Sequence, residues 1–159
     1  GNAVIALDDN KFAGFCYIEQ WGHGNFVANS GLIVHPAYRG RGVAKLIKKT
    51  IFEHSRTKFP DAKVFSITTG LPVMKMNSEL GYKPVTFSEL TDDQAFWKGC
   101  QTCKNYDVLQ RTQQTMCLCT GMLYDPKVEN QKKKKIKENV VKRWKSIKQT
   151  RFLIKNKDK

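Results

Sequence analysis

Two glycines separate an apolar segment from an amphipathic one in Arg39-Gly40-Arg41-Gly42-Val43-Ala44. Because glycine has no Cβ, the chain can turn tightly at Gly40 and Gly42 and bring its N–H groups close to a ligand. Apolar residues then recur at helical spacing, which predicts a helix over about residues 40–56 whose positive N-terminal end points at the same place. The pattern predicts an anion-binding loop of the kind that holds phosphate groups.

Two common phosphate-binding loops do not fit this segment. A P-loop has Lys-Ser or Lys-Thr after its last glycine, whereas Val43-Ala44 follow here. A dinucleotide-binding fingerprint needs a third glycine where Lys45 stands. The remaining pattern, Arg39-x-x-Gly42-x-Ala44 after a strand ending in Val34, resembles the acyl-coenzyme A loop of the GCN5-related N-acetyltransferase (GNAT) superfamily. The alternative is an ordinary strand-turn-helix in which the glycines serve only the turn.

The resemblance implies an α/β fold with a mixed sheet (α+β) that splays around a bound acyl-CoA, with acetyl-CoA as the co-substrate. It implies that backbone N–H groups of Ile33 and Val34 orient the cofactor arm and thioester. It also implies a pyrophosphate site formed by the backbone of Arg39, Gly40, Arg41, Gly42, Val43 and Ala44. The reaction would be direct acyl transfer from the thioester to an amine, with positioning supplying most of the catalysis.

The pattern of apolar residues and turn signals agrees with this order of elements. Strands are expected at residues 3–7, 12–18, 26–34, 64–68, 84–87 and 118–123, and a short helix at about 73–80. The resemblance covers about Ala3 to Tyr124. The family normally begins with another strand and two helices, for which we find no segment before Ala3. We therefore expect either a fragment of a longer polypeptide or an acceptor side supplied by a second subunit or by the C-terminal extension.

Two residues are candidates for the chemical step. Glu19, at the end of the second strand, could accept the proton that an ammonium acceptor must lose, although a solvated carboxylate is an equally good interpretation. His35 and His23 are weaker candidates, because both are expected in turns. Many relatives place a tyrosine four residues before the glycine that ends the short helix, where this chain has Asn77. An amide can hydrogen-bond the sulfur or carbonyl but cannot act as the acid, and an exposed position without a role is the alternative.

Four late cysteines form two close pairs. Cys100 and Cys103 are three positions apart, and Cys117 and Cys119 are two apart. Four thiolates brought together by a hairpin could bind zinc tetrahedrally, whereas the alternative is two pairs of buried or inert thiols. Cys16, inside an early strand, is expected in the core.

Net charge is distributed unevenly over the 159 residues. Residues 1–126 hold 14 Lys and Arg against 11 Asp and Glu, whereas residues 127–159 hold 14 against 3. We therefore expect an acyltransferase domain at 1–126, with a Cys-rich part at 97–126, followed by a basic, helical tail at 127–159. No apolar run approaches membrane-spanning length and no signal-peptide layout is present, which predicts a soluble, cytoplasmic protein without a membrane span.

The tail places Ile136, Val140, Trp144 and Ile147 at helical steps among its lysines. We expect this stripe to pack on the domain or on a second copy in a homodimer. Nucleic acid or an anionic membrane is the alternative partner for such a basic helix.

These features together predict an N-acetyltransferase that uses acetyl-CoA on the primary amine of a small molecule. The segment from Trp97 to Pro126 resembles bacterial GNAT members associated with arginine biosynthesis, in which the acceptor is the α-amine of glutamate. The alternative is a catalytically weak acyl-CoA-binding module whose basic tail binds RNA or a protein partner.

Overall fold

The computed structural model of this chain describes the backbone of residues 1–155 and the side chains of residues 1–147. Contacts divide the chain into two compact units, Gly1–Asp125 and Pro126–Lys159. Residues 156–159 of the predicted basic tail lie outside the described residues.

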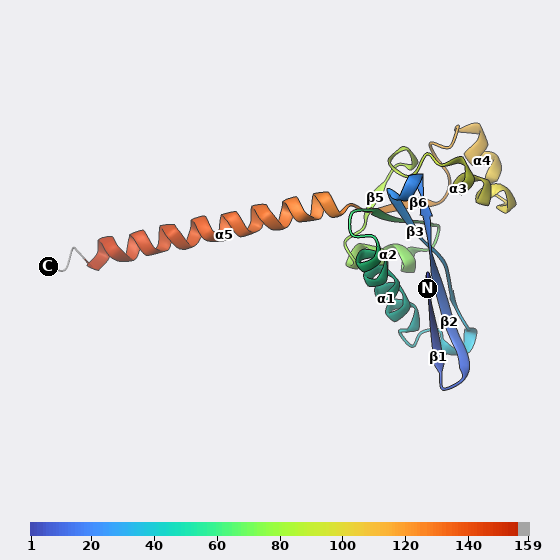
Figure 1. Ribbon diagram of the computed structural model, residues 1–159, viewed down its shortest axis with the longest axis horizontal. Helices are drawn as coiled ribbons and strands as arrows, with labels where there is room; N and C mark the ends of the chain where they lie inside the picture. Colours follow the sequence, from blue (N-terminus) through green and yellow to red (C-terminus); the bar gives the residue numbers. More distant parts are fainter. Residues whose placement is uncertain (156–159) are drawn as a thin grey trace. The chain divides into compact units, whose positions relative to one another are not determined.

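The first unit is built on a six-stranded mixed sheet (Figure 1). Its strands are β1 (Ala3–Asp8), β2 (Lys11–Trp21), β3 (Phe26–Val34), β4 (Lys63–Thr68), β5 (Lys83–Val85) and β6 (Thr120–Tyr124). They lie in the order β1-β2-β3-β4-β6-β5, and only β3 and β4 run parallel to each other. The predicted three-strand meander and the following β-α-β unit are both present. The mixed α+β fold class is therefore confirmed.

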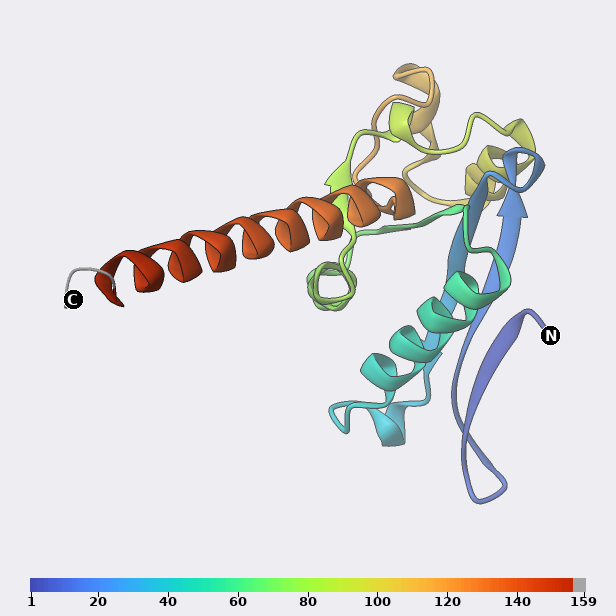
Figure 2. The ribbon, with the colours of Figure 1, turned by 60° about the vertical axis from the view of Figure 1, so that its left-hand side comes forward.

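Helices connect these strands. In the first unit they are α1 (Val43–Lys58), α2 (Leu71–Glu79), α3 (Gln94–Lys98) and α4 (Tyr106–Arg111), with short 3-10 turns at Gly22–Gly24, Pro36–Tyr38, Phe87–Glu89 and Gly99–Thr102. α1 is the crossover that a parallel strand pair requires, and Figure 2 shows it lying along the sheet. α3 and α4 are not predicted by the sequence pattern, because segments of five and six residues are too short to show helical periodicity.

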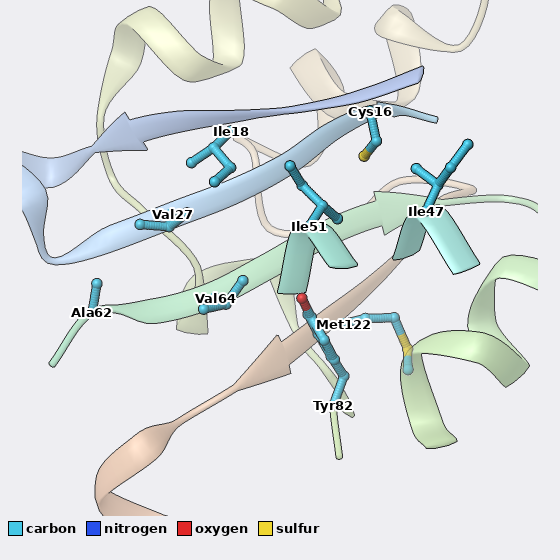
Figure 3. Packing of buried hydrophobic residues seen from close by; sticks show 9 residues of the cluster. All are labelled: Cys16, Ile18, Val27, Ile47, Ile51, Ala62, Val64, Tyr82 and Met122. Carbon is cyan, nitrogen blue, oxygen red and sulfur yellow. The ribbon is translucent and has the colours of Figure 1, made fainter. Parts of the chain in front are cut away.

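Two buried clusters pack on opposite faces of the sheet, because successive strand residues point to opposite sides. The cluster beneath α1 comprises Cys16, Ile18, Val27, Ile47, Ile51, Ala62, Val64, Tyr82 and Met122 (Figure 3). The cluster beneath α3 and α4 comprises Ala28, Phe65, Phe87, Leu90, Trp97, Leu109 and Leu123. β3 and β4 contribute to both clusters and so form the centre of the unit.

The buried face of α1 differs from the face that the sequence predicts. The sequence predicts that Leu46 lies on the apolar face of this helix and that Lys48 lies on the opposite face with Lys45 and Lys49. In the structure Leu46 is 63% exposed, whereas Lys48 is only 1% exposed. The prediction for Lys48 is wrong because residue 48 follows residue 44 by one turn and precedes residues 51 and 55 on the same side of the helix. Only the charge of its side chain had suggested that Lys48 would be exposed to solvent.

The second unit contains α5 (Pro126–Lys155), a single long helix (orange to red in Figure 1). Its described apolar side chains are largely exposed, with Trp144 at 62%. Among the described residues, no helix combines the length and the apolar character needed to cross a membrane. The partner of this helix stays a prediction.

Candidate active site

A cavity opens where β3 and β4 cease to pair. The ladder joins only the beginnings of the two strands, from Phe26 opposite Lys63 to Ala28 opposite Phe65. Beyond it lies a cavity of about 280 Å³. β3 contributes residues 28–32 to the lining, β4 contributes residues 65–68, and α1, α2 and α3 contribute Lys48, Val73 and Phe96. Strands that separate in this way leave backbone groups along their facing edges available to a ligand.

A bulge in β3 shapes one wall of this cavity. Tyr17 pairs with Ser30 and Phe15 with Ile33, so Gly31 and Leu32 together lie opposite a single β2 residue. Gly31 has φ +66°, and a Cβ there would lie 2.3 Å from the Tyr17 ring, so only glycine fits. Residues 30–32 therefore line the cavity. Ile33 and Val34, which were expected to orient the thioester, lie just beyond the cavity lining, and that role stays a prediction.

The glycine loop lies between the end of β3 and the start of α1. Gly40 and Gly42 have φ +73° and +83°, in the left-handed region, and Gly42 is the N-cap of α1. A Cβ at either position would meet no protein atom within 4 Å. The first N–H groups of a helix have no intrahelical partner, so they are available to an anion at this end. The predicted residues Arg39 to Ala44 are thus brought together in an open turn at a helix N-terminus, which fits a phosphate group.

Side chains of the preceding turn fix the loop. The Tyr38 hydroxyl donates to Asp8 Oδ2 (3.0 Å), and the Arg41 guanidinium lies 5.2 Å from the centroid of the Tyr38 ring. Arg39 Nε donates to the Val34 carbonyl oxygen (3.2 Å). These contacts leave Arg39 and Arg41 exposed beside Gly40 and Gly42. Two exposed arginines therefore flank Gly40 in the chain, which adds positive charge near the turn for an anionic ligand.

The two predicted catalytic residues occupy different environments. Glu19 lies on β2, opposite Ala28, is partly buried and does not belong to the cavity lining. Asn77 is 0% exposed, so the alternative of an exposed helix position is wrong. Its Nδ2 donates to Ser66 Oγ (2.7 Å) in the cavity wall, and its Oδ1 has no hydrogen-bond partner. Asn77 therefore connects α2 to β4, and its role in catalysis stays a prediction.

Neither histidine candidate lies in the cavity wall. His35 Nδ1 accepts from the Ala37 N–H (3.3 Å) and is exposed, and His23 adopts φ +55° in the turn between β2 and β3. Both histidines therefore lie in turns, as predicted from the sequence.

A buried polar network that was not predicted from the sequence lies beside the cavity. Asn29 Nδ2 donates to Ser55 Oγ (2.8 Å), and the Tyr82 hydroxyl donates to Asn29 Oδ1 (2.8 Å). The Lys48 ammonium lies 5.7 Å from the centroid of the Tyr82 ring. Burial lowers the pKa of Lys48 and raises that of Tyr82 well above its ordinary value. The seven-residue spacing of Lys48 and Ser55, two helical turns, was the only sequence signal that could have indicated this polar stripe.

The predicted zinc site is not supported. Cys100 lies in the 3-10 turn Gly99–Thr102 and Cys103 follows that turn, whereas Cys117 and Cys119 precede β6 in an irregular segment. Among the described residues, no group of three or more His, Cys, Asp or Glu side chains could hold a metal ion. Burial raises the pKa of Cys100, and burial together with the neighbouring thiols raises the pKa of Cys119 to about 11. As predicted, Cys16 is a core residue with 0% exposure.

Comparison with known proteins agrees with this geometry. Residues 1–76 match the model of the acetyltransferase (GNAT) family. Among curated proteins, none matches the sequence significantly.

Solved structures with the same fold cover more of the chain. N-acetylglutamate synthase from Neisseria gonorrhoeae, complexed with coenzyme A and N-acetylglutamate, aligns with a TM-score of 0.56 and 14% identity over 78% of this chain and 25% of its own. A Mycobacterium tuberculosis protein in complex with CoA gives a TM-score of 0.55 and 15% identity over 78% of this chain and 75% of its own. YncA from Salmonella typhimurium, with its cofactor acetyl-CoA, gives a TM-score of 0.51 and 11% identity over 78% of this chain and 64% of its own.

The chain spans only 33%, 25% and 22% of the length of three of the matching structures. Residues 1–76, which match the family model, contain β1 to β4 and the helix that follows the glycine loop. The family match thus covers residues 1–76 of this chain, which resemble an acetyltransferase domain of the GNAT family.

Proposed function

We propose that this chain transfers an acetyl group from acetyl-CoA to the primary amine of a small molecule, with an amino acid such as glutamate as the acceptor. The observation that carries the proposal is the cavity between β3 and β4. It opens beside the end of the strand from which the glycine loop and α1 begin. A single extended molecule with a phosphate at one end and a thioester at the other would suit this arrangement.

Different parts of the site would bind the pyrophosphate, align the cofactor arm and accept the proton. The backbone of Gly40 to Ala44 would hold the pyrophosphate at the α1 N-terminus, where the helix dipole favours negative charge. The unpaired edge of β3 would align the arm, and the cavity would position the reacting atoms. Acetyl-CoA supplies the activated acyl group when it is bound. Glu19 or a water molecule would accept the proton that the ammonium acceptor must lose.

An amino acid acceptor is supported by the fold likeness to N-acetylglutamate synthase, whose structure contains N-acetylglutamate. The resemblance of residues 97–126 to arginine-biosynthesis members points to the same substrate class.

Isothermal titration with acetyl-CoA and a turnover panel of amines test this proposal together. CoA release should be followed by chromatography, because accessible free cysteines such as Cys103 would also react with thiol reagents. We expect binding of acetyl-CoA and turnover with at least one small amine, glutamate included in the panel. Binding without turnover on any amine would favour the acyl-CoA-binding module, and absence of binding would refute the proposal.

A further inference from the structure

Lys48 places an ammonium group in the interior of the domain without an anion beside it. The residue is 1% exposed and is the one charged residue among the described residues that line the cavity between β3 and β4. Within the described part of the chain, no carboxylate forms an ion pair with it. A buried cation is costly unless it is paired, so this position requires either a neutral amine or an anion from outside the chain.

The titratable neighbours of Lys48 do not supply that anion. The Cys16 thiol donates to the Ser30 carbonyl oxygen (3.1 Å), and burial raises its pKa, so it remains neutral. The Tyr82 hydroxyl donates to Asn29 and is neutral for the same reason. The cluster therefore has an unmatched positive charge whenever Lys48 is protonated.

Two hydroxyl groups in the same cavity wall are suited to the same ligand. Ser66 Oγ accepts from Asn77 Nδ2 (2.7 Å), and Thr68 Oγ1 accepts from the Gly70 N–H (3.0 Å). In the described residues neither hydroxyl donates a hydrogen bond to a protein acceptor, so both O–H groups are available. A carboxylate only accepts hydrogen bonds, and one ammonium with two hydroxyls offers it donors alone.

We propose that the cavity between β3 and β4 binds a carboxylate group through Lys48, with Ser66 and Thr68 as additional donors. The inference rests on the proposed acyl-transfer function and specifies its substrate class. The carboxylate belongs either to the acyl chain of the donor or to the acceptor amine. The volume of about 280 Å³ suits a chain of a few carbons and excludes a large anion.

Matched ligand pairs separate the two sources. In the donor arm, succinyl-CoA and butyryl-CoA are compared by isothermal titration, because they share a four-carbon acyl chain and differ in the terminal carboxylate. In the acceptor arm, kcat/KM with acetyl-CoA is compared for alanine against isopropylamine and for 4-aminobutyrate against butylamine. We expect wild-type protein to prefer the carboxylate by about tenfold or more in one arm.

Lys48→Met is the test variant, because methionine fills a similar volume without the charge. It should lose most of the carboxylate preference, which is read as the ratio of affinities or of kcat/KM values within each matched pair. Lys49→Met is the matched control, since Lys49 is the next residue of α1 and is exposed. Thr68→Val removes one hydroxyl and should reduce the preference several-fold, which keeps the proposal testable if Lys48→Met fails to fold.

The outcomes distinguish this inference from the proposed function. Acetyl-CoA binding and turnover with no carboxylate preference in either arm would overturn the inference and leave the acyltransferase proposal standing. A preference retained by Lys48→Met would overturn the inference as well. Absence of acetyl-CoA binding by wild-type protein would overturn both.

Discussion

Replacement of Gly42 by valine perturbs the loop at its most constrained backbone position. Gly42 has φ +83° and caps α1, so a β-branched residue there must either accept strain or turn the loop to negative φ. The strain costs about 1–2 kcal/mol, which corresponds to a fall in melting temperature of roughly 3–8 °C for a domain of this size. No clash adds to it, because a Cβ at Gly42 meets no protein atom within 4 Å.

The effect on ligand binding should be larger than the effect on stability. A change of backbone conformation at residue 42 would change the direction of the N–H groups of the α1 N-terminus. Each charge-assisted hydrogen bond to phosphate is worth about 1.5–3 kcal/mol. Loss of one such bond weakens acetyl-CoA binding by about 10- to 150-fold. Isothermal titration with acetyl-CoA, after circular dichroism has confirmed folding, measures this directly.

Gly24→Val provides the matched control. Gly24 has φ +86° and nearly open space around it, but it lies at the opposite end of β3, in the turn that follows β2. It should show the same loss of melting temperature with unchanged acetyl-CoA affinity. Undiminished affinity in folded Gly42→Val, or an equal loss in Gly24→Val, would refute the assignment of the loop.

Further predictions concern stability and assembly. Gly31→Ala should destabilise the domain by about 1–3 kcal/mol in urea unfolding, because its Cβ would overlap the Tyr17 ring at a positive φ; an unchanged midpoint would contradict the bulge. Lys48→Met should be more stable than wild type at neutral pH. Since burial lowers the pKa of Lys48 in the folded chain, the unfolded chain binds more protons between that lowered pKa and about pH 10.5. Wild-type stability therefore rises through this window, and the difference should shrink there; a difference independent of pH would count against a lowered pKa at Lys48. Deletion of residues 127–159, or Trp144→Ala, should cause aggregation, lower stability or a changed oligomer, as measured by light scattering and thermal melting. An unchanged oligomeric state and melting temperature in both variants would instead favour a tail that binds another partner.

The local sequence determined the elements that build the site. Glycines at positions 40 and 42 indicate backbone conformations that other residues adopt at a cost, and apolar periodicity marks the helix behind them, so both could be found without tertiary information. The strands of the meander and β4 follow equally from short apolar runs bounded by turn residues. These signals are local because backbone conformation and helix capping depend on residues only a few positions apart.

Tertiary structure alone decided what surrounds the reacting groups. The cavity exists because β3 and β4, separated in sequence by α1, pair over only three residues, and no periodicity encodes where a ladder ends. Lys48 carries a charge that predicts solvent, yet its position on α1 faces the core. Asn77 is likewise buried through its bond to Ser66, and the late cysteines fail to form a metal site through side-chain geometry. Burial depends on which distant elements pack together, and that information is not contained in any short segment of the chain.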